Sequence, residues 1–182
     1  KHVFVQKPLT HTVFEARKIT EAARQAGVVT QMGNQGHSYE SMRVLKEWLD
    51  DGAIGDVTEV HAWTDRPVGG DPWSDFVQMA QPKDTPPVPG TLDWDLWLGP
   101  APFKPYHPHR VHGTFRGYWD YDGGGLGDMG MHYLDPVQYI LDKDDTSPVE
   151  VWADGPQQHP DACGTWRRIE MKYTDGCTIV LD

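Results

Sequence analysis

The most informative part of this sequence is the stretch Gly123-Gly124-Gly125-Leu126-Gly127-Asp128-Met129-Gly130-Met131-His132-Tyr133-Leu134-Asp135. It holds five glycines, which adopt positive φ readily and let the backbone approach another group closely. Apolar residues recur at helical spacing from Met131 to Leu141, which predicts a short amphipathic helix. Asp128 and His132 are four residues apart and would share one helix face. The stretch therefore predicts an acid–base pair at a helix start.

The same glycines fit a dinucleotide-binding fingerprint by coincidence. Gly125, Gly127 and Gly130 match G-x-G-x-x-G letter by letter. That fingerprint has meaning only directly after a buried strand, whereas residues 118–122 read Tyr-Trp-Asp-Tyr-Asp. Asp128 would also place a negative charge beside the phosphates. The simpler reading is a glycine-rich turn before a helix.

Composition limits the partners of the chain. The 182 residues carry a net charge of −11, with a pI near 5.1, which argues against nucleic acid and anionic membranes as partners. No apolar run approaches the roughly 20 residues of a membrane span. Two cysteines, Cys163 and Cys177, do not make a disulfide framework. Because they flank a predicted hairpin, a single cross-strand bridge stays open.

The first 51 residues have an alternating strand and helix pattern. Thr12 and Glu15 form a capping box, and Gly27 suits the C-terminal cap of the helix that follows. Lys7 would stand at the carboxyl end of the first strand, where ligands bind in open α/β sheets. The pattern predicts a right-handed parallel unit made of a strand over 1–8, a helix up to Ala26, a strand over 28–32 and a helix over 38–51.

The remainder predicts an α+β domain with a mostly antiparallel sheet. Residues 56–64, 149–153 and 165–173 read as strands, and Asp175-Gly176 is a hairpin signal. Residues 65–120 hold ten prolines, but clustered tryptophans favour an ordered, packed excursion there (Trp73, Trp94, Trp97, Trp119). The open face of the sheet predicts self-association into a homo-oligomer.

Both ends of the chain read as interrupted. The sequence enters directly on an apolar strand, and it stops within another one at Asp182. Strand edges of this kind must be covered. We therefore expect a fragment, or a chain whose edges are covered by a partner.

Several motifs together resemble the Gfo/Idh/MocA oxidoreductase family, the relatives of glucose–fructose oxidoreductase and inositol dehydrogenase. Lys7-Pro8 after an apolar strand is similar to its Glu-Lys-Pro motif. Gly123-Gly124-Gly125 with Asp128, His132 and Asp135 is similar to its Gly-Gly…Asp-x-x-x-His signature. Three further segments resemble a bacterial subgroup often exported by a twin-arginine route: residues 33–38, 92–100 and 115–120. The resemblance covers essentially all of residues 1–182 and leaves the compartment open between cytoplasm and periplasm.

The resemblance implies two domains and a hydride-transfer reaction. Residues 1–54 would be the residual part of a dinucleotide-binding Rossmann domain. Residues 55–182 would be a substrate-binding and oligomerisation α+β domain, incomplete at its C-terminus. NAD or NADP would be the cofactor, and a sugar or polyol the substrate. By analogy, Lys7, Asp128 and His132 are the catalytic residues, with His132 taking the hydroxyl proton. Positions that match the cofactor-binding motif are Gln6, Lys7, Pro8 and Asn34.

Two departures from the family pattern bear on cofactor binding. Gln6 replaces the usual glutamate, so it carries no charge to tune Lys7. The true G-x-G-x-x-G turn and the ribose-binding acid are absent from the sequence. We therefore expect the 182-residue chain alone to bind the dinucleotide weakly or not at all.

Other candidates have an equally good packing explanation. Trp63, Arg66, Tyr106 and Trp119 would line the sugar pocket or would simply pack. Arg116, Asp128 and His132 are further candidates for substrate binding. His107, His109 and His112 have metal-ligand spacing. Their segment is rich in proline and has no cysteine, so a surface or sugar-binding loop is favoured over a metal site.

Three functions stay open from the sequence. The first is a fragment of an NAD(P)-dependent sugar or polyol oxidoreductase. The second is a glycosidase-like hydrolase or lyase acting on a glycoside without the full cofactor domain, an idea that Asp120 and Asp122 near Asp128 keep open because glycosidases use two carboxylates. The third is a non-catalytic carbohydrate-binding module.

Overall fold

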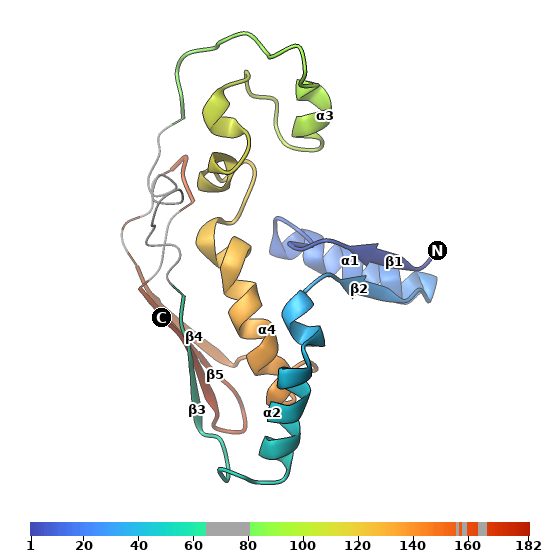
Figure 1. The fold of residues 1–182 in the computed structure, drawn as a ribbon, viewed down its shortest axis with the longest axis vertical. Helices are drawn as coiled ribbons and strands as arrows, with labels where there is room; N and C mark the ends of the chain where they lie inside the picture. Colours follow the sequence, from blue (N-terminus) through green and yellow to red (C-terminus); the bar gives the residue numbers. More distant parts are fainter. Residues whose placement is uncertain (65–80, 156, 158–159, 164–166) are drawn as a thin grey trace. The chain divides into compact units, whose positions relative to one another are not determined.

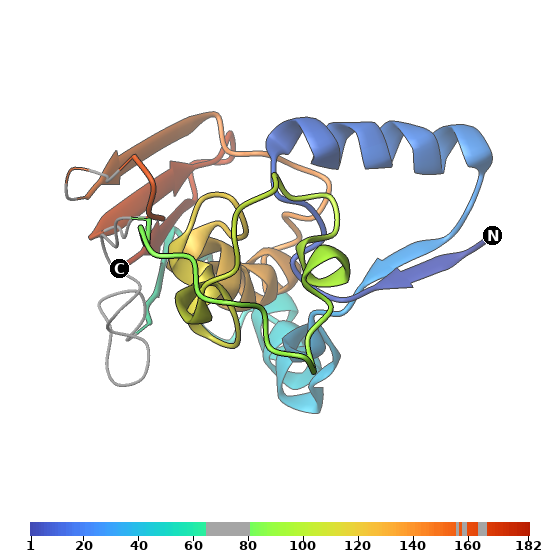
Figure 2. The same ribbon diagram turned by 90° about the horizontal axis from the view of Figure 1, so that it is seen from above.

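A computed structural model describes residues 1–64, 81–155, 157, 160–163 and 167–182. The chain folds into two compact units (Figures 1 and 2). The first unit comprises Lys1–Thr64, Met129–Asp154 and Arg167–Asp182, and the second comprises Asp65–Asp128 and Gly155–Trp166. Three segments that are distant in sequence therefore fold together in the first unit.

The first unit begins with a parallel strand–helix–strand motif, as the sequence predicted. Its elements are β1 (Val3–Val5), α1 (Val13–Ala26) and β2 (Thr30–Met32), and β1 pairs with β2 in parallel. The capping box is complete, because the Glu15 main-chain N–H donates to Thr12 Oγ1 at 3.2 Å and the Thr12 N–H donates to Glu15 Oε2 at 2.9 Å. Gly27 ends α1 in the left-handed region, at φ 59°.

The same unit contains a four-stranded mixed sheet in the order β3-β6-β5-β4. The strands are β3 (Glu59–Ala62), β4 (Glu150–Asp154), β5 (Arg168–Lys172) and β6 (Thr178–Leu181). β3 pairs with β6 in parallel, whereas the other two pairings are antiparallel. The predicted hairpin is confirmed, and Gly176 provides its positive φ of 89°. The sheet is thus mostly antiparallel, with one parallel edge that the sequence did not predict.

Burial is concentrated on the central strand of this sheet. Ile179, Val180 and Leu181 of β6 are fully buried. Helix α4 (Met131–Ile140) packs against β3, α2 (Glu40–Asp50) and the 3₁₀ turn η1 (Gln35–Ser38). Figure 1 shows α2 and α4 side by side. The predicted helix over 38–51 therefore starts two residues later, because η1 takes up the residues before it.

The second unit contains the predicted packed excursion in its described part. Its elements are α3 (Trp94–Leu98) and the 3₁₀ turns η3 (Pro108–Arg110) and η4 (Thr114–Gly117). Trp94 and Leu98 pack with Tyr106 and Val111, and the Trp94 indole N–H donates to the Lys104 carbonyl at 2.8 Å. Trp97 stacks on Trp94, whereas Trp119 is 41% exposed and Trp73 lies outside the described residues.

Both cysteines are free thiols, so the cross-strand bridge that the sequence left open is not formed. Each is buried in its own unit, Cys177 in the first and Cys163 in the second. The Cys163 thiol donates to the Asp122 carbonyl at 2.9 Å. Among the described helices, none combines the length and apolar character that a bilayer span requires.

Candidate active site

The carboxyl ends of β1 and β2 bring two predicted site residues to one edge. The strands are in register with Val5 opposite Met32, and the Gly33 N–H donates to the Val5 carbonyl at 2.9 Å. Lys7 and Asn34 each lie two residues beyond the carboxyl end of their strand. Ligands of open parallel sheets bind at this end. The prediction for Lys7 as a residue at the carboxyl edge is therefore consistent with the strand pairing, and Gln6 and Pro8 flank it there.

The glycine-rich stretch forms a π-helical turn over Leu126–Gly130, which leads directly into α4. π-Helical turns are rare and are found mostly at functional sites. His132 lies in the first turn of α4, and the proline at 136 has no N–H to donate to the His132 carbonyl. The predicted helix is confirmed. The described residues 81–122 contain no strand directly before the glycines, so the dinucleotide reading of this stretch fails on its structural context.

Asp128 is a buried carboxylate with a cationic neighbour in the second unit. It is 7% exposed, and its Oδ1 lies 3.3 Å from Arg116 Nε. The Arg116 guanidinium also lies over the Phe115 ring, 4.6 Å from the ring centroid. A buried charge needs such pairing to remain ionised. Arg116, which the sequence assigned to substrate binding, is thus engaged with the very carboxylate that the resemblance assigns to catalysis.

A histidine–carboxylate pair that sequence reasoning did not select lies in the first unit. His37 Nδ1, from η1, is 3.3 Å from both carboxylate oxygens of Asp135 on α4. The His37 ring also contacts the Tyr139 ring at a centroid distance of 4.5 Å. Asp135 follows His132 by three residues, so the two share one face of α4. The two residues are 98 positions apart in the sequence, so only the three-dimensional structure shows that they are in contact. Both lie within the motifs that carry the family resemblance.

The remaining predicted substrate residues differ in how far they are exposed. Trp63, just after β3, is 71% exposed, and Trp119 is 41% exposed. Tyr106 is buried in the aromatic cluster around Trp94, which favours the packing explanation that the sequence left open. Arg66 lies outside the described residues.

The three histidines with metal-ligand spacing do not gather into a ligand set. His107 uses both ring nitrogens, since Nδ1 accepts from the His109 N–H at 3.1 Å and Nε2 lies 3.3 Å from Asp84 Oδ1. His112 has a positive φ of 57° at the end of its turn. Across the described ranges, no group of three or more metal-ligating side chains occurs.

The residues at the carboxyl edge fit one end of a nicotinamide dinucleotide. Asn34 Oδ1 is buried and has no hydrogen-bond partner within the described part of the chain, so it suits a donor such as a carboxamide N–H or a ribose hydroxyl. Lys7 at the same edge adds a cation. After β1, however, the chain reads Gln6-Lys7-Pro8-Leu9, which supplies no glycine turn for the pyrophosphate.

Burial disfavours the ionised forms of a cysteine and two tyrosines in the second unit. Desolvation raises the pKa of the Cys163 thiol to about 12 and that of Tyr121 to about 12. The Tyr118 hydroxyl is also buried, and its pKa is raised for the same reason. Burial and the hydrogen bond that the thiol donates to the Asp122 carbonyl both disfavour the thiolate form that a nucleophilic cysteine requires.

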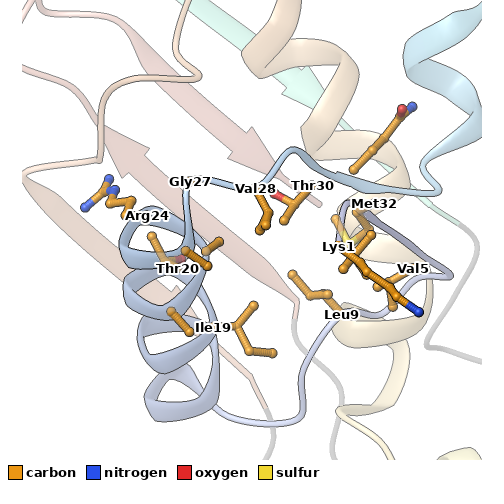
Figure 3. A pocket seen from close by; sticks show the side chains of 15 residues that line it. Lys1, Val5, Leu9, Ile19, Thr20, Arg24, Gly27, Val28, Thr30 and Met32 are labelled. Carbon is orange, nitrogen blue, oxygen red and sulfur yellow. The ribbon is translucent and has the colours of Figure 1, made fainter.

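A large apolar cavity lies between α1 and the two parallel strands (Figure 3). Its volume is about 800 Å³, and side chains such as Val5, Ile19, Val28 and Met32 face it. None of Lys7, Asn34, His37 and His132 belongs to its lining. The cavity is therefore the interface between helix and sheet rather than the polar site at the strand ends.

Comparison with known proteins agrees with these features. Residues 41–182 match the sequence profile of the Gfo/Idh/MocA oxidoreductase family's C-terminal alpha/beta domain. No curated protein matches the chain. Solved structures with a similar fold include a putative NADPH-dependent oxidoreductase from Desulfitobacterium hafniense, which is 20% identical with a TM-score of 0.59 over 100% of this chain and 41% of its own.

Two further solved structures show the same fold. An NAD-binding oxidoreductase from Klebsiella pneumoniae is 20% identical, with a TM-score of 0.59 over 99% of this chain and 40% of its own. The WlbA dehydrogenase from Bordetella pertussis, in complex with NADH and UDP-GlcNAcA, is 16% identical, with a TM-score of 0.59 over 100% of this chain and 44% of its own. The chain thus spans about two fifths of the length of these structures. On the profile match over most of its residues, the chain belongs to the Gfo/Idh/MocA oxidoreductase family.

Proposed function

We propose that this chain is part of an NAD(P)-dependent oxidoreductase that acts on the hydroxyl group of a sugar or polyol. The observation that carries the proposal is that Lys7 and Asn34 each follow the carboxyl end of one of two paired parallel strands, β1 and β2, by two residues. Helix α4, which bears His132, packs against the turn that leaves β2. The structures that share the fold are NAD- or NADPH-linked oxidoreductases, and the WlbA complex contains a nucleotide sugar.

The proposed chemistry assigns one task to each residue. His132 accepts the proton of the substrate hydroxyl as the hydrogen on the same carbon leaves with its electron pair, so that the alcohol becomes a carbonyl. Lys7 and Asn34 would hold the nicotinamide end of the cofactor, which would supply the acceptor for that hydride. Lys7 stabilises the negative charge that develops on the oxygen. An unperturbed histidine titrates near neutral pH and is suited to this role. Asp128 lies buried beside Arg116 in the second unit, and only the family resemblance assigns it to the acid–base group.

The division of labour between domains is part of the same proposal. We assign residues 1–54 to the end of a dinucleotide-binding domain and residues 55–182 to the substrate domain. Parallel pairing of β1 and β2 around α1 supports the first assignment, and the family match over 41–182 supports the second. Because the described chain supplies no pyrophosphate turn, we expect the 182 residues alone to bind NADH weakly, with no saturation of NADH fluorescence at micromolar concentrations.

We also propose that the chain forms a homo-oligomer through its sheet. Edge strand β4 and the residue before it expose large apolar side chains: Val149 is 66% exposed, Val151 60% and Trp152 51%. An exposed apolar edge strand is a template for pairing with another chain. A second copy of the chain would cover these side chains.

The experiment uses the natural protein in which this sequence occurs. A panel of sugars and polyols is incubated with NAD⁺ or NADP⁺, and reduced cofactor is followed by absorbance at 340 nm. The proposal predicts substrate-dependent reduction of one cofactor. The competing glycosidase reading predicts cleavage of aryl glycosides without added dinucleotide. Glycoside cleavage with no reduction of either cofactor would overturn the proposal in favour of that reading.

A further inference from the structure

The geometry of the His37–Asp135 pair determines which nitrogen of the neutral imidazole ring carries the proton. Nδ1 lies 3.3 Å from each carboxylate oxygen of Asp135, so it faces the carboxylate symmetrically. An ionised carboxylate only accepts hydrogen bonds. The proton of a neutral His37 is therefore held on Nδ1, and Nε2 keeps its lone pair.

The other side of the ring is open to a ligand. The His37 side chain is 42% exposed, whereas that of Asp135 is only 23% exposed. Over the described ranges of the chain, the polar contacts of the His37 side chain are both made by Nδ1. The Tyr139 ring at 4.5 Å supports one face of the imidazole. The Asp135 carboxylate therefore holds the Nδ1 side of the ring and the Tyr139 ring contacts it, while Nε2 remains as a hydrogen-bond acceptor.

The position of the pair in the fold places it beside the proposed site. η1 begins at Gln35, one residue after Asn34, at the carboxyl end of β2. Asp135 lies one helical turn after His132 on the same face of α4. His37 therefore belongs to the edge where Lys7 and Asn34 lie, and it is joined to the helix that carries His132.

We propose that His37, oriented by Asp135, is a further binding residue of this site, which accepts a hydrogen bond from a ligand hydroxyl through Nε2. The inference rests on the proposed function for the identity of the site and adds the recognition of one hydroxyl of a neutral polyol. Nε2 is an acceptor with a carboxylate behind it, so it selects a hydroxyl donor over an anion. Asp135 is a positioning residue that acts through His37 and contacts no ligand itself.

The test is nitrogen-15 NMR of the histidine side chains, with D-glucose as the probe. The expected spectrum shows Nδ1 of His37 as the protonated, pyrrole-type nitrogen and Nε2 as the unprotonated, pyridine-type nitrogen. Titration with D-glucose is expected to shift the Nε2 resonance in a saturable manner. A reversed tautomer, or an Nε2 resonance that D-glucose leaves unchanged, would overturn the proposal.

Matched variants separate ligand binding from folding. His37→Phe keeps a ring against Tyr139 but removes both nitrogens, and Asp135→Asn keeps the shape but removes the carboxylate that fixes the tautomer. Each is expected to weaken D-glucose binding about tenfold, the scale of one hydrogen bond. His2→Phe, at an exposed position before the amino end of β1, is the control and should leave Kd unchanged. Equal Kd values for wild type and His37→Phe would contradict the proposal.

The measurement is independent of hydride transfer. It needs neither dinucleotide nor turnover. A failure to reduce NAD(P)⁺ would therefore count against the proposed function, but it would leave a saturable shift of the His37 Nε2 resonance as valid evidence of binding. Conversely, an active enzyme whose His37 Nε2 resonance does not respond to D-glucose would refute only the present inference.

Discussion

The Arg116–Asp128 pair gives the sharpest energetic prediction from this structure. The two charges are 3.3 Å apart, with side-chain exposures of 26% for Arg116 and 10% for Asp128. At an effective dielectric constant of about 20, Coulomb's law gives an attraction of about 5 kcal/mol for this distance of 3.3 Å. Desolvation offsets part of this, and Asp128 has a further interaction in the structure. We therefore expect a net coupling of about 2 kcal/mol in the free energy of unfolding.

A double-mutant cycle measures that coupling. Arg116→Met, Asp128→Asn and the double variant are unfolded in urea at pH 7, and tryptophan fluorescence reports the transition. Arg116→Met leaves a buried carboxylate with weaker compensation and should be the most destabilised of the three, by about 3 kcal/mol. The double variant should recover part of that loss, because the buried charge is gone.

An exposed pair in the first unit is the control. Arg167 Nε and Asp154 Oδ2 are 2.7 Å apart, so their contact is shorter, but the side chains are 60% and 41% exposed. The corresponding cycle with Arg167→Met and Asp154→Asn should show a smaller coupling, of at most about 1 kcal/mol, because water screens exposed charges even though this guanidinium contacts both carboxylate oxygens. If the Arg116 and Asp128 effects were additive to within about 0.5 kcal/mol, the reasoning from burial would be refuted.

Three further predictions concern the sheet of the first unit. Ile179→Ala should lower the free energy of unfolding by about 2–5 kcal/mol in urea titrations, because Ile179 is fully buried in β6; Val151→Ala, at a 60% exposed position, should change it far less. His61 lies 2.8 Å from Glu59 and 3.1 Å from Asp182, and these hydrogen bonds raise its pKa. A raised pKa contributes stability that is complete below the unfolded value near 6.5 and is lost as pH rises through the folded value. The stability advantage of wild type over His61→Gln should therefore be larger at pH 6 than at pH 9 in thermal unfolding, and an equal advantage at both would contradict this assignment. Trp152→Glu should shift the protein toward monomer in sedimentation velocity, whereas an unchanged distribution would show that β4 is not the self-association surface.

Local signals explain which parts of the fold the sequence predicted. The capping box at Thr12 and Glu15, the left-handed Gly27 and the Asp175-Gly176 turn each act over a few residues, and all three are present in the structure. The parallel pairing of β3 with β6 was not predicted, because it joins segments more than a hundred residues apart. Such pairing depends on tertiary packing, which periodicity does not encode.

In the candidate site, too, local motifs could be predicted from the sequence, whereas contacts between distant residues could not. Lys7 and His132 were identified from short motifs, and the strand register and α4 place them at the ends of elements that the sequence also predicted. The π-helical form of the glycine stretch was not foreseen, since its letters fit several turns equally well. The partners of Asp128 and of His37 come from distant or neighbouring elements, so only the three-dimensional structure reveals them.

The central claim, that His132 and Lys7 carry out acid–base work during hydride transfer, is tested most directly by single-turnover reduction of NAD(P)⁺ at 340 nm. The natural protein that contains this sequence is compared with its His132→Ala, Lys7→Met and His2→Ala variants on the substrate found in the panel. Loss of a general base should slow the His132→Ala reaction by about 10²- to 10⁴-fold, with Lys7→Met also strongly impaired. The His2→Ala control, at an exposed position before the amino end of β1, should keep the wild-type rate. A His132→Ala rate equal to that of wild type would contradict the account.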